Sequence, residues 1–267
     1  MENLSHRASS ELSRVDYVLC DLDDTLTIDG KLPPASYSAL AALEAAGIAV
    51  VVVTGRPAGW CDMIARMWPV SAVVGENGAF YFRYIAQERR LVRHLQRSEA
   101  QRRADRQVLE TAWQAIKARH PELELATDQP YRISDYAVNF CEDMAHPGED
   151  VVSDVVRMFE ASGALAKVSS IHVNAWIGTF TKVDMSLALL QREFGVDAET
   201  ARTCVVYAGD SPNDEPMFEY FPLSVGVANI RKFTSRMRTM PRWITDREGG
   251  HGFEELAKAV IAARSTG

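Results

Sequence analysis

Short apolar runs, each followed by polar residues or glycine, recur along this chain. One extends from Val15 to Cys20, interrupted by Asp16, and another from Ile48 to Val53 is continuous and β-branched. Runs of this kind are typical of parallel strands buried on both faces. Between them, the alanine- and leucine-rich segment Ala35 to Ala46 predicts a helix that stops at Gly47. Strand, helix and strand make a right-handed βαβ unit, which predicts a parallel sheet.

The apolar pattern continues on both sides of a long segment of different character. Further core strands are predicted at Ala72–Val74, Cys204–Ala208, Ser224–Val227 and Trp243–Thr245, with a helix at Lys182–Phe194. In between lie a long polar helix, two strands and a second helix, predicted at Gln96–Arg119, Ala137–Cys141, Ala166–Trp176 and Pro147–Ser162. We therefore predict an α/β fold, with a Rossmann-like parallel-sheet core at 15–83 and 179–267. A smaller α/β module is inserted at 84–178, and a flexible tail occupies 1–14.

Composition narrows the functional classes. The 267 residues carry a net charge of −7, which argues against general nucleic-acid binding. The longest apolar run is far too short to span a bilayer. The polar first 14 residues have no apolar segment typical of a signal peptide. The four cysteines are scattered without a C-x-x-C pair, which indicates reduced thiols and no zinc site. We expect a cytoplasmic protein without nucleic-acid or membrane partners.

Two acidic clusters each follow an apolar strand. Asp21 and Asp23 are two residues apart on an extended segment, so their side chains are expected to face one cleft. Asp210 and Asp214 form the second cluster. Neighbouring carboxylates repel unless a cation or a shared proton lies between them, and Mg²⁺ prefers such oxygens. Taken singly, either cluster is also compatible with an acidic surface loop.

Two further positions combine polar chemistry with a helix start. Thr54 follows the second strand, and Pro57 suits the first turn of the next helix, where free N–H groups favour phosphate. Lys182 opens its helix, although acids are preferred at this end of the helix dipole. Such a local misfit points to a functional role.

These segments together resemble the motifs of the haloacid dehalogenase (HAD) superfamily of phosphohydrolases. Asp21-Leu22-Asp23-Asp24-Thr25-Leu26-Thr27 resembles the first motif, and Val-Val-Thr-Gly-Arg, ending at Arg56, resembles the second. Lys182 stands at the place of the third motif, and Gly209-Asp210-Ser211-Pro212-Asn213-Asp214 resembles the fourth. Glu76-Asn77-Gly78-Ala79 resembles subclass IIB, whose Cof-like, sucrose-phosphatase-like and mannosyl-3-phosphoglycerate-phosphatase-like members carry a large α/β cap.

The resemblance implies a role for each candidate residue. Catalytic roles fall to Asp21, Asp23, Thr54 and Lys182. The expected Mg²⁺ ligands are Asp21, Asp23, Asp210 and Asp214. The expected substrate contacts are Thr54, Gly55, Arg56, Asn77, His172, Asn174, Lys182 and Asn213. Asp21 would attack phosphorus, while Asp23 would act as acid and base.

Several of these residues have alternative interpretations from the sequence alone. Arg56 is also compatible with a solvated position, and Asn77 with a simple hairpin turn. Alternation places Ser170, His172 and Asn174 on one strand face, which is either the solvent side of an edge strand or a substrate-facing wall.

The resemblance implies a Mg²⁺-dependent phosphatase acting on a small phosphorylated metabolite. A sugar phosphate or a glycosyl-glycerate phosphate is the expected substrate, with an aspartyl-phosphate intermediate. The alternatives are a phosphotransferase or phosphomutase with the same nucleophile, and a non-catalytic ligand-binding regulator.

Overall fold

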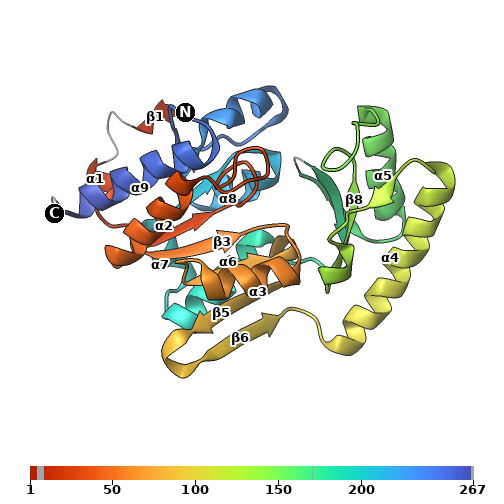
Figure 1. The fold of residues 1–267 in the computed structure, drawn as a ribbon, viewed down its shortest axis with the longest axis horizontal. Coiled ribbons are helices and arrows are strands. Elements are labelled where there is room, and N and C mark those ends of the chain that lie inside the picture. Colours follow the sequence, from red (N-terminus) through yellow and green to blue (C-terminus); the bar gives the residue numbers. More distant parts are fainter. Residues whose placement is uncertain (5–8, 170, 266–267) are drawn as a thin grey trace.

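The computed structural model describes residues 1–4, 9–169 and 171–265, and contains two β-sheets with helices packed against them (Figure 1). The larger sheet has nine strands in the order β1-β13-β12-β11-β2-β3-β4-β5-β6. Their bounds are β1 Glu2–Asn3, β2 Tyr17–Cys20, β3 Ala49–Val53, β4 Ala72–Gly75, β5 Phe80–Ile85, β6 Arg90–Leu95, β11 Val205–Gly209, β12 Leu223–Gly226 and β13 Trp243–Ile244. In this spatial order, all strands from β1 at one edge through β13, β12, β11, β2 and β3 to β4 are parallel. The strands β5 and β6 add an antiparallel hairpin at the other edge.

Helices bury both faces of the large sheet. Val18 of β2 packs in the cluster that includes α2 (Pro34–Ala45), α3 (Ala58–Met67) and α9 (Gly249–Ser265). Its neighbour Leu19 packs on the opposite face, against α6 (Lys182–Phe194), α7 (Ala198–Cys204) and α8 (Glu215–Tyr220). Successive residues of the strand thus face different helical layers, as expected from continuous apolar runs. The predicted α/β fold with a Rossmann-like core is confirmed.

The smaller sheet lies between its own helices and the core. Its antiparallel strands are, in order, β7 (Glu124–Leu125), β8 (Asp135–Asn139), β10 (His172–Trp176) and β9 (Leu165–Val168). The helices α4 (Glu99–Arg119) and α5 (Glu149–Ala161) pack against one face through an apolar cluster that includes Val138 and Val173. Alternation leaves the other face with polar residues, and Figure 1 shows α4 and α5 on the side away from the core.

Three segments differ from the expectation. Residues 166–176 form two strands of a hairpin, β9 and β10, because the chain reverses direction between them, and Ser170 lies outside the described residues. The predicted module boundary at residue 84 falls inside β5, whose hairpin partner β6 remains in the large sheet. The first residues are not wholly a tail, since β1 pairs with β13 and buries Leu4 beside it. Within the described ranges, no helix is long and apolar enough to cross a membrane.

Candidate active site

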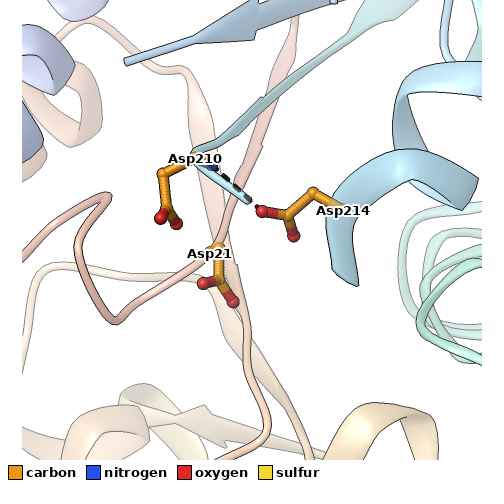
Figure 2. A group of neighbouring side chains, drawn as sticks. All are labelled: Asp21, Asp210 and Asp214. Atoms are coloured by element: carbon orange, nitrogen blue, oxygen red, sulfur yellow. Dashed lines mark hydrogen bonds between the residues drawn. The ribbon is translucent and has the colours of Figure 1, made fainter. Parts of the chain in front are cut away.

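Three aspartates converge at the carboxyl ends of two neighbouring parallel strands. Asp21 follows β2 and Asp210 follows β11, and these two strands are paired. Asp214 closes the short 3₁₀ turn η5 (Pro212–Asp214), and Figure 2 shows its carboxylate directed toward the other two. One carboxylate oxygen from each residue lies within 4.8 Å of the others, and all three residues are buried. Backbone connectivity therefore places three acidic groups where ligands bind in open α/β sheets.

The second acidic cluster is held in place by its own loop. One oxygen of Asp214 accepts hydrogen bonds from the backbone N–H of Asp210, at 3.0 Å, and of Ser211, at 3.3 Å. The other oxygen accepts from the Tyr207 hydroxyl at 2.5 Å. Asn229 donates to Asp210 at 3.4 Å and to the carbonyl of Asp24 at 2.9 Å, linking both acidic loops. These contacts fix the carboxylates in orientation.

Lys182 is the cation of this cluster. Its ammonium donates to Asp21 at 2.8 Å and to Asp214 at 3.1 Å, and it is buried. Thr181 caps the helix that Lys182 opens, by accepting the N–H of Asp184. Gly78 permits the close approach of this helix start, because a Cβ there would lie 2.1 Å from the Thr181 carbonyl oxygen. The two carboxylates raise the pKa of the ammonium in spite of its burial.

The negative charge of the cluster exceeds what one lysine compensates. Burial, with additional repulsion from Asp214, raises the pKa of Asp21 to about 7, although Lys182 opposes the shift. Burial and the same neighbour raise the pKa of Asp210 well above its ordinary value. A buried set of three hard oxygen ligands with surplus negative charge fits a divalent cation such as Mg²⁺.

The Asp23 carboxylate does not join this group and pairs with Arg56 instead. Arg56 Nε lies 3.1 Å from both carboxylate oxygens of Asp23, and Nη2 lies 2.8 Å from one of them. The expected convergence of four carboxylates is therefore wrong for the Asp23 side chain. The physical reason is that a forked guanidinium stabilises this carboxylate, whereas a fourth carboxylate in the cluster would add repulsion.

Arg56 is a buried residue and not a solvated one. Its guanidinium lies 4.5 Å from the centre of the Trp60 ring and contacts Glu142 at 2.8 Å and Asp128 at 3.5 Å. The preceding Thr54 is fully buried, and its hydroxyl oxygen accepts the backbone N–H of Arg56 at 3.0 Å. The loop at the start of α3 is therefore well ordered before any ligand binds.

A small cavity of about 20 Å³ lies between the strand ends of the large sheet and the polar face of the small sheet. It is lined by Asp21, Asp23, Gly55, Arg56, Ser169, Ile171, His172, Asn174, Ser211 and Asn213. His172 and Asn174 are buried, so the polar face of β10 is not a solvent side. Asn174 donates to Asp135 at 3.0 Å, and Asn213 accepts from Ser211 at 2.9 Å.

Asn77 lies behind this cavity and does not line it. Its buried side chain approaches Gly55, where a Cβ would stand 3.2 Å from the amide. Its Nδ2 has no hydrogen-bond partner among the described residues. Asn77 also has a left-handed backbone with a φ of 56°, which asparagine tolerates better than most residues.

Two charged residues between β7 and α5, Arg132 and Glu142, complete the site, although no sequence motif predicts them. Glu142 contacts Arg56 at 2.8 Å and His172 Nε2 at 2.7 Å, and the second contact lacks hydrogen-bond geometry. The contact with His172 and the charge of Arg56 lower the pKa of Glu142 to about 2. Arg132 bridges the two parts, because its guanidinium donates to the Gly55 carbonyl at 2.9 Å. No motif surrounds Glu142 or Arg132, so only the folded chain reveals their positions.

Comparisons with known proteins agree with this arrangement. A family model described as haloacid dehalogenase-like hydrolase matches residues 18–110. No curated protein matches the sequence detectably. A Thermoplasma acidophilum protein of known structure is 16% identical, with a TM-score of 0.69 over 93% of this chain and 99% of that one.

Two other solved structures are similar over nearly the whole chain. A HAD/Cof-like hydrolase from Plasmodium vivax is 15% identical, with a TM-score of 0.67 over 93% of this chain and 96% of its own. A sucrose-phosphatase from Synechocystis, solved with sucrose and phosphate, is 15% identical, with a TM-score of 0.61 over 91% and 97%. The family model confirms the resemblance to the haloacid dehalogenase-like hydrolases over residues 18–110, and these solved structures share the fold of the chain.

Proposed function

We propose that this protein is a Mg²⁺-dependent phosphatase that hydrolyses a small phosphate monoester through an aspartyl-phosphate. The observation that carries the proposal is the position of Lys182, whose ammonium joins Asp21 to Asp214 within the buried three-carboxylate cluster. A nucleophilic carboxylate beside a lysine and a cation site is suited to phosphoryl transfer, where charge stabilisation is the main requirement.

The proposed reaction has two steps. Asp21 attacks phosphorus, the bond from phosphorus to the ester oxygen breaks, and Asp23 gives its proton to that oxygen. Asp23 then takes a proton from water, whose oxygen attacks phosphorus and frees Asp21 and inorganic phosphate. A bound Mg²⁺, held by Asp21, Asp210 and Asp214, would neutralise the phosphoryl oxygens. Thr54 and Lys182 are proposed to bind the same oxygens.

The ion pair between Arg56 and Asp23 bears on the first step. The guanidinium is paired with the Asp23 carboxylate at 2.8 Å, whereas the acid role needs a proton on Asp23. An incoming phosphoryl group offers Arg56 another anion to bind. We therefore propose that substrate binding draws Arg56 toward the phosphoryl group and leaves Asp23 free to take up a proton.

The substrate is proposed to be a sugar phosphate or a glycosyl-glycerate phosphate. The structural similarity to a sucrose-phosphatase and to a trehalose-6-phosphate phosphatase-related protein supports this class. The inserted module, residues 84–178 by the sequence, is proposed as the cap that selects the leaving group. A phosphotransferase would share the nucleophile and pass the phosphoryl group to a sugar hydroxyl, so product analysis separates the two activities.

Hydrolysis of p-nitrophenyl phosphate tests the proposal. Activity should disappear with EDTA and return with Mg²⁺, because the carboxylate cluster needs a divalent counter-charge. Asp210→Asn should shift the Mg²⁺ titration to higher concentration, while the exposed Asp150→Asn on α5 should leave it unchanged. Full activity in EDTA, or an unchanged titration for Asp210→Asn, would contradict the metal assignment.

A further inference from the structure

Glu142 occupies a position between the two parts of the cavity wall. It follows β8, and its two carboxylate oxygens contact different cavity-lining residues, Arg56 at 2.8 Å and His172 at 2.7 Å. The side chain is 25% exposed, so it is neither sealed in the core nor free in solvent. Glu142 does not itself line the cavity, but its carboxylate lies directly behind two residues that do.

The cations around the cavity are already paired with carboxylates. Arg56 is shared by Asp23, Asp128 and Glu142. Lys182 is shared by Asp21 and Asp214. In the part of the chain that the structure describes, these two are the lysine and arginine side chains that reach the cavity and the carboxylate cluster, so neither is available for a second anionic group on a substrate.

Arg132, which donates to the carbonyl of the cavity-lining Gly55, is also paired with carboxylates. Its fully buried guanidinium pairs with Asp128 and Asp135 at 3.0 Å. The other polar groups of the wall, apart from the carboxylates, are the His172 imidazole, which contacts Glu142, and the hydroxyls and amides of Ser169, Asn174, Ser211 and Asn213. Hydroxyls and amides bind sugar or polyol hydroxyls, whereas an anion near Glu142 would meet a like charge, and it would compete with that carboxylate for Arg56 and His172.

We propose, resting on the phosphatase function above, that Glu142 is a specificity-determining residue that excludes leaving groups with a negative charge. The enzyme would accept phosphate esters of neutral, hydroxylated compounds and discriminate against esters that carry a carboxylate or a second phosphate. Of the two substrate classes named above, this selects the sugar phosphate over the glycosyl-glycerate phosphate, because glycerate brings a carboxylate to the leaving group.

A pair of aryl phosphates of nearly equal size tests the charge filter directly. The leaving group of 4-carbamoylphenyl phosphate is uncharged at its para position, whereas 4-carboxyphenyl phosphate carries a carboxylate there. With Mg²⁺, the wild type should prefer the carbamoyl ester by about 10-fold or more in kcat/KM, because the carboxylate of the other ester is repelled by Glu142. In Glu142→Gln the ratio should fall to within about 3-fold, because the repelling charge is gone.

The controls separate charge from folding and from the underlying activity. Asp143→Asn makes the same change at the next, exposed position and should keep the wild-type ratio. Glu142→Ala removes the charge without adding an amide, and provides a second measurement should Glu142→Gln fold poorly. A wild type that hydrolyses both esters equally well, or a preference that persists in both Glu142 variants, overturns the charge filter alone. If no aryl phosphate is hydrolysed with Mg²⁺, the phosphatase function fails, and the filter fails with it.

Discussion

At the residue scale, Asp21 and Asp23 are held by different cations. Asp21 accepts from Lys182 inside the carboxylate cluster, whereas Asp23 pairs with Arg56 at the cavity wall. Their proposed tasks need opposite protonation states, since a nucleophile must be ionised and a general acid must carry a proton. The two carboxyls therefore have different cationic partners, although the charge of Asp23 still contributes to the raised pKa of Asp21.

The general acid can be tested through the dependence on the leaving group. Asp23→Asn keeps the nucleophile but cannot protonate the ester oxygen. We expect it to lose at least ~10³-fold in kcat/KM on an alkyl phosphate, about 4 kcal/mol of barrier, and much less on an activated aryl phosphate. A leaving-group series with steady-state kinetics measures this. Equal losses across the series would show that Asp23 does not act as the acid.

The main chemical groups of the site could be predicted from single residues, but their pairing could not. Asp21 and Asp210 come together because the strand ends of a parallel sheet share one edge, which the apolar pattern already indicates, and Lys182 joins them from the start of α6. The partner of Asp23 depends on the rotamer of Arg56 and on Glu142, which is more than 80 residues distant along the chain. Such a long-range contact leaves no local pattern.

At the element scale, Glu76 joins the end of β4 to the segment before β8. Its buried carboxylate accepts backbone N–H groups from Ala58 at 3.0 Å, Ile133 at 3.0 Å and Ser134 at 2.6 Å. Glu76 has a φ of 44°, a strained value for a residue other than glycine. We interpret the strain as the cost of aiming one carboxylate at donors from two parts of the chain.

This element predicts a pH dependence of stability. Burial raises the pKa of Glu76 to about 8, above the ~4.3 expected for the unfolded chain. Between these values the folded chain binds more protons than the unfolded chain, so its contribution to the free energy of unfolding falls as the pH rises. Urea unfolding at pH 5, 6.5 and 8 should show a smaller decline for Glu76→Gln than for the wild type.

The control for this measurement is Glu160→Gln, an exposed acid at the end of α5 that should follow the wild type. Parallel pH profiles for the wild type and Glu76→Gln would mean that the Glu76 carboxyl is not protonated in the folded protein over this range. The acceptor role toward Ala58, Ile133 and Ser134 would then belong to a permanently ionised group.

Element types could be predicted well where the apolar pattern was long and periodic, as for the helix from Lys182 to Phe194. The prediction of one strand over 166–176 was wrong, because the core-facing residues change from even positions in β9 (Ala166, Val168) to odd positions in β10 (Val173, Ala175), and a single alternation cannot describe both. No strand was predicted at β6, where the residues are only partly buried and Arg90 and Arg93 are exposed, so the apolar signal is weak.

At the scale of the whole molecule, the two sheets are closed onto each other. The cavity of about 20 Å³ holds roughly one water, which needs about 10–15 Å³. The proposed sugar phosphate is far larger, so under this proposal we expect the two parts to separate for binding and product release. The contacts that would break include the one from Arg132 to the Gly55 carbonyl and the one from Glu142 to Arg56.

A division of labour between the two parts follows from this arrangement. His172→Ala and Asn174→Ala change the wall supplied by the small sheet, while the carboxylate cluster on the large sheet is left intact. We expect each variant to lower kcat/KM for the best sugar phosphate about 10-fold or more, and to affect p-nitrophenyl phosphate much less. Equal losses on both substrates would place these residues in the phosphoryl-transfer chemistry or in folding.

The central claim is that Asp21 becomes phosphorylated during turnover, and rapid-quench labelling tests it most directly. The wild type, mixed with a ³²P-labelled substrate and Mg²⁺ and quenched with acid within milliseconds, should carry label that is lost on hydroxylamine treatment, as expected for an acyl phosphate. Asp21→Asn should carry none and should lose at least ~10³-fold in turnover, because the nucleophile is absent. Label retained on Asp21→Asn, or an unlabelled wild type that turns over at full rate, would contradict the account.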